Sequence, residues 1–263
     1  MADSMYQGGD GIQTGLELFD IEKTNIQAGW DWAERNLRQS SAAASLCSSY
    51  PDAGAYVLDL RLHPREKIRW LETAVAVARQ LKDRGAEGRH LGNLGNAYKN
   101  LGDARKAIEY YQQALAIARE ISDRRNEGAW LGNLGLAYAD LGDARKAIEN
   151  YQQALAISRE IGDRRGEGNG LGNLGNAYKN LGDARKAIEY YDQALAISRE
   201  IGDRRGEGNH SWNLGLEYEK AGDLERAADL MQVCVDYERK IGHPDAEKDA
   251  QRLDDILERL KMR

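Results

Sequence analysis

The chain of 263 residues is 41% apolar and 30% charged, and its formal net charge at pH 7 is -6. Basic and acidic residues alternate, which argues against the clustered basic surface of a nucleic-acid binder. No apolar run approaches the ~18 residues of a membrane-spanning helix. The two cysteines, Cys47 and Cys234, lie far apart and indicate no disulfide framework. We therefore expect a cytoplasmic protein without nucleic-acid or membrane partners.

The N-terminal part of the chain has irregular helical sequence. Residues 1–15 are polar and Gly-rich, and we expect a flexible segment there. Residues 16–63 are predicted to form an N-terminal helical region and the start of a degenerate repeat. Its first, amphipathic helix carries Trp30 and Trp32, which fall on apolar stripes and are expected in the core. Pro51 should interrupt the helix that follows.

The middle of the chain repeats itself at an offset of 40 residues. The segment LGNLGNAYKNLGDARKAIEYYQQALAIAREISD starts at Leu91, near-identical copies start at Leu131 and Leu171, and a decayed copy follows from Ser211. Such self-similarity indicates an array in which each unit buries its apolar face against its neighbours. We predict these segments: the second helix of a degenerate repeat at 64–83, repeats at 84–123, 124–163 and 164–203, a divergent repeat at 204–243, and a capping helix at 244–263.

A pair of turn residues divides each repeat. Gly-Asp recurs every 20 residues from Gly102-Asp103 onward, with Ser122 once in place of Gly. Gly adopts the left-handed conformation that ends a helix, and Asp caps the next helix by accepting from its free N–H groups. Small residues such as Gly95 indicate close helix contacts, and large aromatic residues fill the spaces between them: Tyr111, Tyr151 and Tyr191. Each repeat is therefore predicted to be two antiparallel helices joined by tight turns.

Each copy contains a Leu, Leu-Gly three residues on, then Tyr, a central Ala, an aromatic residue and a further Ala. This pattern resembles the tetratricopeptide repeat. Arg119 stands where the 34-residue form has Pro, and the 40-residue length is similar to repeats of the Partner-of-Inscuteable and kinesin-light-chain types. The resemblance covers roughly residues 64–242. It implies an all-α fold, a right-handed superhelical solenoid of antiparallel helix pairs with a C-terminal capping helix.

A second resemblance concerns the order of segments along the chain. The stretch FDIEKTNIQAGWDWAERN, followed by degenerate and then regular repeats, is similar to the junction after the ATPase module in bacterial STAND signalling proteins of the NB-ARC type. In those proteins the repeats form the C-terminal sensor. The resemblance implies that this chain is part of a larger signalling protein.

In arrays of this family the first helix of each pair lines a concave groove. The resemblance therefore implies ligand contacts on the face of the first helix that points away from its partner helix, called its outer face below. One Asn per repeat falls there: Asn93, Asn133, Asn173 and Asn213. An Asn amide both donates and accepts hydrogen bonds, which suits holding a peptide backbone. The same amides could instead bond to neighbouring helices and set the pitch of the array. Both interpretations stay open at this stage.

Further candidates for the groove differ in chemistry between repeats. Further polar and basic side chains could extend the row of four asparagines, and the intervening repeat has an apolar residue, Leu136, instead. The polar and basic residues are Asn96, Lys99, Asn176 and Lys179. Large side chains are expected at the border of the groove: Arg89, Trp130 and Trp212. Trp is a common hot-spot residue at interfaces. We therefore expect a protein or peptide partner with acidic and apolar side chains.

No catalytic residue, metal site or cofactor is predicted. The four His are single and lack the spacing of zinc ligands, and the Gly-rich strings lack the Lys-Ser/Thr of a phosphate loop. The Arg pairs in GDRRGEG are interpreted as solvated first-turn residues. The functional prediction is a non-enzymatic module that binds a protein or peptide, as the sensor or scaffold part of a signalling protein. The alternatives are a self-associating, homo-oligomeric array and a regulatory domain that docks on an ATPase or a protease.

Overall fold

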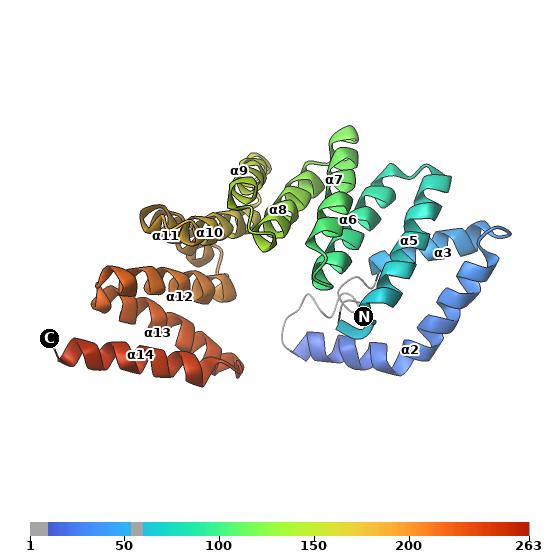
Figure 1. Ribbon diagram of the computed structural model, residues 1–263. Helices are drawn as coiled ribbons and strands as arrows, with labels where there is room; N and C mark the ends of the chain where they lie inside the picture. Colours follow the sequence, from blue (N-terminus) through green and yellow to red (C-terminus); the bar gives the residue numbers. More distant parts are fainter. Residues whose placement is uncertain (1–9, 54–59, 263) are drawn as a thin grey trace. The chain divides into compact units, whose positions relative to one another are not determined.

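A computed structural model describes residues 10–53 and 60–262. Over these residues the chain is built of α-helices joined by short turns, and Figure 1 shows them as successive antiparallel pairs. The all-α prediction is confirmed. The helices are α2 (Asp10–Asn36), α3 (Ser41–Ala53), α5 (Pro64–Leu81), α6 (Arg84–Asn100), α7 (Ala104–Glu120), α8 (Arg124–Asp140), α9 (Ala144–Glu160), α10 (Arg164–Asn180), α11 (Ala184–Glu200), α12 (Arg204–Ala221), α13 (Leu224–Ile241) and α14 (Ala246–Lys261).

The chain divides into two compact units. Unit 1 runs from Met1 to Ala137 and unit 2 from Tyr138 to Arg263, so the boundary falls inside α8. Within each unit, helices that follow one another in the sequence pack against one another, as in α5–α6–α7 and α9–α10–α11. This order of contacts is the one expected of stacked helix pairs.

In unit 1, the helices α2, α3 and α5 enclose an aromatic core. Trp30 and Trp70 stack with ring centroids 4.4 Å apart, and Tyr50 meets both rings edge-on. Trp30 is fully buried, whereas Trp32 is 47% exposed. The prediction that both belong to the core is therefore wrong for Trp32. Residues two apart lie about 200° apart around a helix, so a single buried face cannot hold both.

Two other expectations for this region differ from the structure. Helix α2 already begins at Asp10, so residues 10–15 are helical; the remainder of the segment expected to be flexible lies outside the described residues. Helix α3 continues through Pro51 to Ala53, so the predicted interruption is wrong. A proline lacks the N–H that would bond to the carbonyl four residues earlier, and α3 continues past Pro51 for two further residues despite this loss.

The turns between helices form as their sequence predicts. Gly102 and the glycines that recur every 20 residues after Ser122 take positive φ values between 65° and 82°, and Ser122 adopts the same left-handed conformation with φ 57°. The carboxylate of Asp103 accepts a hydrogen bond of 3.1 Å from the backbone N–H of Lys106. Asp143 and Asp183 cap the next second helices in the same way. These caps fix the length of each helix and therefore the repeat of the fold.

Within a pair, a tyrosine of the second helix packs onto a glycine of the first. A Cβ atom on Gly95 would lie 2.5 Å from the ring of Tyr111, and Gly175 stands in the same relation to Tyr191. Both tyrosine side chains are fully buried. The absence of a side chain at glycine thus provides the space for the ring.

A buried glutamate near the start of each first helix connects consecutive helices. In unit 2, Glu167 accepts a hydrogen bond of 2.8 Å from Nε of Arg159 on α9 and a second from Arg164 on its own helix. The other members of this set are Glu87, Glu127 and Glu207. The first Arg of each GDRRGEG pair thus has a buried partner in addition to its contact with solvent: Arg164 is partly exposed and Arg204 is exposed, as predicted, while each binds a buried glutamate. A buried carboxylate needs such partners to offset its lost hydration.

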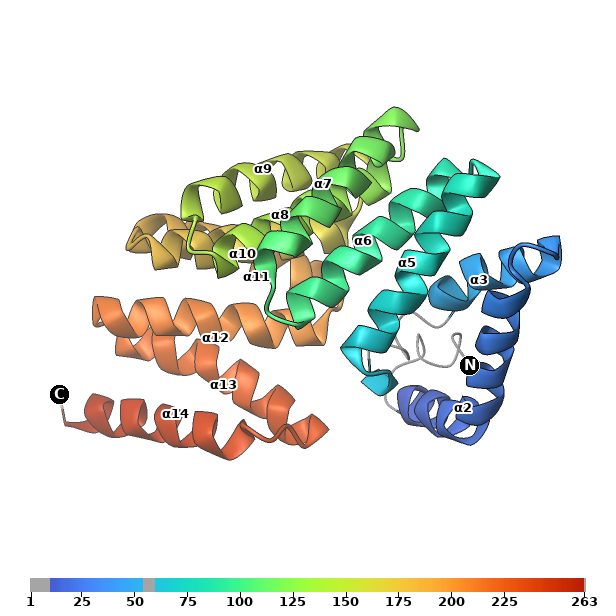
Figure 2. The ribbon, with the colours of Figure 1, turned by 45° about the vertical axis from the view of Figure 1, so that its right-hand side comes forward.

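Helix α14 covers the last repeat of unit 2, and Figure 2 shows it alongside α13. Leu253 and Ile256 pack against Met231 and Val235 in one apolar cluster. On its outer side, Arg252 and Arg259 both bind the carboxylate of Glu219 on α12. The helix thus closes an apolar face that the final repeat would otherwise expose.

Candidate binding surfaces

In unit 1, an amide side chain of α6 is hydrogen-bonded to one of α8, so two consecutive first helices are in contact through asparagines. The amide oxygen of Asn96 accepts hydrogen bonds from the Tyr111 hydroxyl, at 2.7 Å, and from the Asn133 amide, at 3.2 Å. Asn93 lies one turn earlier on α6 and is partly exposed. Its amide has no hydrogen-bond partner among residues 10–53 and 60–262. Asn96 is therefore held by internal hydrogen bonds, whereas Asn93 is not.

In unit 2, α10 and α12 carry the corresponding residues. Asn176 accepts a hydrogen bond of 2.6 Å from the Tyr191 hydroxyl, and the Lys179 ammonium donates to the amide oxygen of Asn213 at 3.3 Å. The Asn213 amide also donates to the backbone of its own helix. Asn173 repeats the situation of Asn93: it is partly exposed, and its amide is unpartnered within the described part of the chain.

Lys179 is a partly buried basic group of this face. Burial lowers the pKa of Lys179 below its ordinary value, and the nearby Lys220 acts in the same direction, while Glu217 opposes them. Glu217 is itself buried and forms a 2.7 Å ion pair with Lys220. An acidic group of a ligand placed near the half-buried ammonium of Lys179 would stabilise its charged form.

The remaining predicted residues lie in different surroundings. Trp130 is 7% exposed; it stacks on Tyr111 and fills the space above Gly92, so its surroundings are those of a packing residue. Trp212 is half-buried and packs against the cluster under α14. Arg89 is exposed on α6, whereas Lys99 and Leu136 are partly buried on α6 and α8.

Two features of the structure have no counterpart in the sequence predictions. One is the set of buried Glu–Arg contacts described above, which has the sequence R-E-I-x-D-R-R-x-E at Glu127, Glu167 and Glu207 and R-Q-L-K-D-R-G-A-E at Glu87. The other is a depression between the second helices α9 and α11, with Leu174 of the first helix α10 also in its lining. The first could have been suspected from a Glu at an apolar position of each repeat. The second has no local sequence signal, because it depends on the spacing of two helices.

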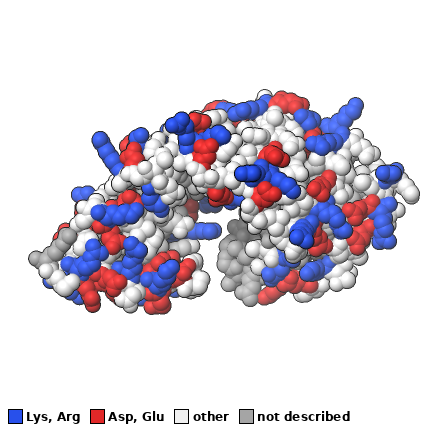
Figure 3. Space-filling model, viewed as in Figure 1, with Lys and Arg blue, Asp and Glu red and all other residues white. Residues whose placement is uncertain are grey.

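The surface charge and the composition of the helices bear on which other kinds of ligand or surface the chain could contact. Figure 3 shows Lys and Arg interspersed with Asp and Glu over the face in view. Among the described residues, no group of three His, Cys, Asp or Glu side chains is placed to hold a metal ion. Of the helices in the same ranges, none combines the length and apolarity needed to cross a membrane.

The family model for the tetratricopeptide repeat matches residues 68–120, 87–160 and 166–237, which together exceed half of the chain. A search of curated proteins finds no relative. Among solved structures, BtubC (BKLC) from P. vanneervenii superposes with a TM-score of 0.70 at 21% identity, covering 85% of this chain and 90% of that one.

Two further structures agree with the resemblances seen in the sequence. A putative kinesin light chain of Podosopora anserina with nearly identical repeats gives a TM-score of 0.58 at 19% identity, over 82% of this chain and 96% of that chain. The STAND protein PH0952 of Pyrococcus horikoshii, which has a tetratricopeptide-repeat sensor, gives 0.59 at 20% identity, over 90% of this chain and 38% of that one. Similarity at this level of identity establishes a shared fold.

Proposed function

The chain belongs to the tetratricopeptide-repeat family, a family of protein-interaction modules, and from this premise we propose that it binds a peptide or protein through its first helices. The surfaces concerned are the outer faces of α6 and α8 in unit 1 and of α10 and α12 in unit 2. We further propose that the chain acts as the sensor or scaffold part of a larger signalling protein, by analogy with the STAND protein whose sensor shares its fold.

The observation that carries the proposal is the pair of unpartnered amides, Asn93 and Asn173. Each occupies the same place in its repeat, and neither forms a side-chain hydrogen bond with any described residue. An amide group can pair with both the N–H and the C=O of an extended peptide. If these residues served packing alone, we would expect them to be bonded as Asn96 and Asn176 are.

The neighbouring side chains indicate the character of the partner. On unit 1, the partly buried Lys99 adds a positive charge and Leu136 an apolar contact. On unit 2, Lys179 lies close to Asn213 and favours an acidic group. A peptide that alternates acidic and apolar side chains fits these faces, because charge complementarity selects the partner and apolar contact adds affinity.

Selection from a displayed peptide library tests this character. Peptides are selected on the wild-type chain and then compared on Asn93→Ala/Asn173→Ala and on a control, Gln113→Ala/Asn150→Ala. The control removes exposed amides of the second helices that bond only to their own helix backbone. Enriched acidic and apolar peptides that bind wild type and control, but lose binding to the Asn93/Asn173 variant, support the proposal. Equal binding to all three would refute it.

Self-association through α2 is a second candidate, favoured by an exposed apolar stripe. Leu18, Ile21 and Trp32 are each more than one-third exposed and lie on one side of α2 at heptad-like spacing. A surface of this kind commonly marks a protein contact. Sedimentation velocity over a range of concentrations tests it: Trp32→Glu should abolish any concentration-dependent increase in size, and a wild-type chain that stays monomeric throughout excludes it.

A further inference from the structure

The depression noted above lies between two second helices, whereas the faces proposed to bind a peptide lie on first helices. It is bounded by α9 and α11, its base is Leu174 of α10, and its volume is about 370 Å³. Ligand sites for small molecules begin at roughly this size. It belongs wholly to unit 2 and shares no residue with the first-helix faces.

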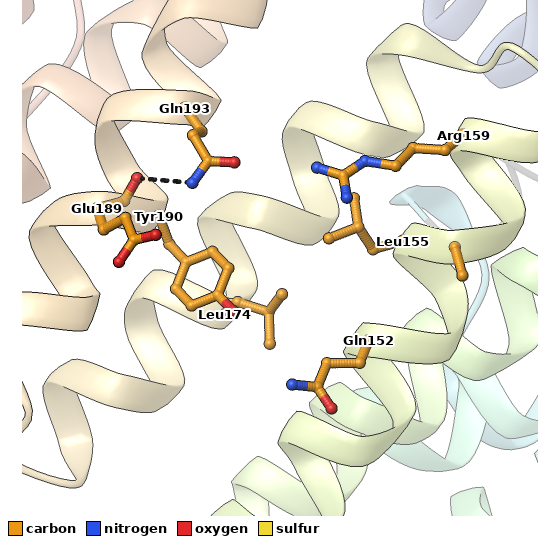
Figure 4. A pocket seen from close by; sticks show the side chains of 8 residues that line it. Gln152, Leu155, Arg159, Leu174, Glu189, Tyr190 and Gln193 are labelled. Carbon is orange, nitrogen blue, oxygen red and sulfur yellow. Dashed lines mark hydrogen bonds between the residues drawn. The ribbon is translucent and has the colours of Figure 1, made fainter.

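The base of the depression is apolar and its two walls are polar. Leu155 and Leu174 are buried and form the base. Gln152 and Arg159 come from α9, while Tyr190 and Gln193 come from α11 (Figure 4). An aliphatic body could therefore contact the leucines while its polar end reaches the side chains of both walls.

Arg159 is the positive group of the depression. Its Nε donates to Glu167 at 2.8 Å, and in Figure 4 its terminal nitrogens extend toward α11. The Gln193 amide nitrogen donates to the backbone oxygen of Glu189 at 3.3 Å, which leaves its amide oxygen for a ligand. Figure 4 shows the Glu189 carboxylate on the far side of the Tyr190 ring from α9. A guanidinium with free N–H groups beside amides is suited to a carboxylate.

Corresponding positions elsewhere show why this place differs. Between α5 and α7, Glu72 stands where α9 has Gln152, and it contributes to raising the pKa of Tyr110 after burial and Tyr98. Glu72 therefore adds a negative charge beside that tyrosine. On α13, Leu230 replaces Tyr190 and packs onto the core around Tyr191. The α9–α11 position has neither the additional carboxylate nor the filling leucine.

We propose that this depression binds a small aliphatic carboxylate, with the chain on Leu155 and Leu174 and the carboxylate on Arg159. Gln152 and the Tyr190 hydroxyl supply further hydrogen bonds to the oxygens. The site would give the array a small-molecule ligand in addition to its protein or peptide partner. It does not depend on the proposed function of the first helices.

An NMR titration of the ¹⁵N-labelled chain with 4-methylpentanoate tests the site, with the neutral 4-methylpentanamide as the matched ligand. Shifts should be confined to residues of α9, α10 and α11 around the depression. The amide should bind about tenfold more weakly, the loss expected for one charge-assisted hydrogen bond. Equal affinity for acid and amide, or shifts scattered over the surface, would overturn the proposal.

Two variants complete the test. Gln152 is exposed, and Gln152→Glu places there the negative charge that Glu72 has at the corresponding position. This variant should bind the carboxylate about tenfold more weakly. Gln113→Glu places the same change on α7, outside the depression, and should leave the affinity unchanged. If both variants bind the carboxylate as the wild type does, the assignment is wrong. Neither variant alters Asn93 or Asn173, so peptide binding by the first helices reports on the other proposal separately.

Discussion

The hydroxyl groups of Tyr111 and Tyr191 determine what the neighbouring asparagines can do. Each donates to the amide oxygen of an Asn one repeat helix away, Asn96 or Asn176, and holds it against the core. Burial raises the pKa of Tyr191 well above its ordinary value, so the hydroxyl remains a proton donor at neutral pH. Of the Asn residues proposed for binding, Asn93 and Asn173 are the ones whose side chains form no hydrogen bond with any described residue.

Truncation of the corresponding tyrosine in the middle repeat should be costly. Tyr151 is 2% exposed, and Tyr151→Ala should lower the free energy of unfolding by about 3–5 kcal/mol, as for other buried aromatic truncations. Lys146→Ala, on the exposed side of the same helix, should leave the unfolding midpoint unchanged. Urea unfolding followed by circular dichroism measures both. Similar small effects would contradict the assignment of the packed face.

Two glycines provide a matched pair for the role of helix spacing. A Cβ at Gly175 would meet the ring of Tyr191, whereas a Cβ at Gly132 would meet nothing within 4 Å. Gly175→Ala should therefore destabilise the fold by about 1–3 kcal/mol through overpacking. Gly132→Ala should stabilise it by about 0.5–1 kcal/mol, because alanine restricts the unfolded chain. Thermal unfolding distinguishes the two, and shifts of the same sign would refute this account of the glycines.

At this scale the sequence predicts packing better than it predicts partners. The apolar stripe correctly places Tyr111, Tyr151 and Tyr191 in the core, because helical spacing alone decides which side chains face inward. It cannot distinguish Asn93 from Asn96, since both lie on the same helix and the difference arises from a hydroxyl on the next one. The wrong prediction for Trp32 has another cause: Trp30 and Trp32 lie about 200° apart around α2, so only one of them can face the core.

The buried Glu–Arg contacts connect consecutive helices, and they should make the free energy of unfolding depend on pH. Burial alone would raise the pKa of Glu167, but its hydrogen bonds to Arg159 and Arg164 hold the pKa below the ordinary 4.5; Glu127 and Glu207 behave alike. Since a lowered pKa favours the folded state only when the carboxylate is charged, the contribution is complete above pH 4.5 and is lost as pH falls through the lowered value.

A triple Gln variant at Glu127, Glu167 and Glu207 tests this dependence. The wild type should lose stability steeply on acidification below pH 4.5, and the variant should start less stable at neutral pH and change less with acid. Unfolding midpoints between about pH 3 and 7 give the two slopes, across the range where carboxyl groups titrate. Parallel curves for wild type and variant would show that other carboxylates control the acid transition.

The contact between α13 and α14 should respond to pH in the opposite direction. Glu238 is buried, one of its oxygens has no hydrogen-bond partner among the described residues, and Asp249 of α14 faces it. Burial first, and the Asp249 charge second, raise the pKa of Glu238; burial also raises that of Asp249. The other groups facing this pair are Cys234, His243, Asp245 and Lys248, with the His243 ring 3.8 Å from Glu238.

A carboxyl group with a raised pKa stabilises the folded state only while it is protonated. Docking of α14 should therefore weaken as pH rises above the ordinary 4.5 and through the raised value. Glu238→Gln, which is neutral and similar in shape, should slow amide hydrogen exchange in α14 at neutral pH and remove its pH dependence. Glu258→Gln, which changes an exposed carboxylate of α14, is the control. Faster exchange in the Glu238 variant would contradict this explanation.

For the whole molecule, the repeat period was sufficient to identify the family and the helix pairs. A 40-residue period with Gly-Asp turns allows few other folds, because each unit must bury its apolar face against the next. The N-terminal helices were harder to predict, since α2 and α3 have no second copy for comparison and their core depends on a stack of Trp30 on Trp70. The division into two units inside α8 has no signal in the repeats, which are nearly identical on either side of it.

The central claim, that the first-helix amides hold a partner protein or peptide, is tested most directly by capture from a cell lysate with mass-spectrometric identification. The wild-type chain is compared with a variant in which Asn93, Asn133, Asn173 and Asn213 are all Ala, and with the Gln113→Ala/Asn150→Ala control, after circular dichroism has shown that all three are folded. We predict a protein retained by wild type and control and lost by the fourfold variant. Retention of the same proteins by all three chains would contradict the claim and assign the asparagines to the packing of the array.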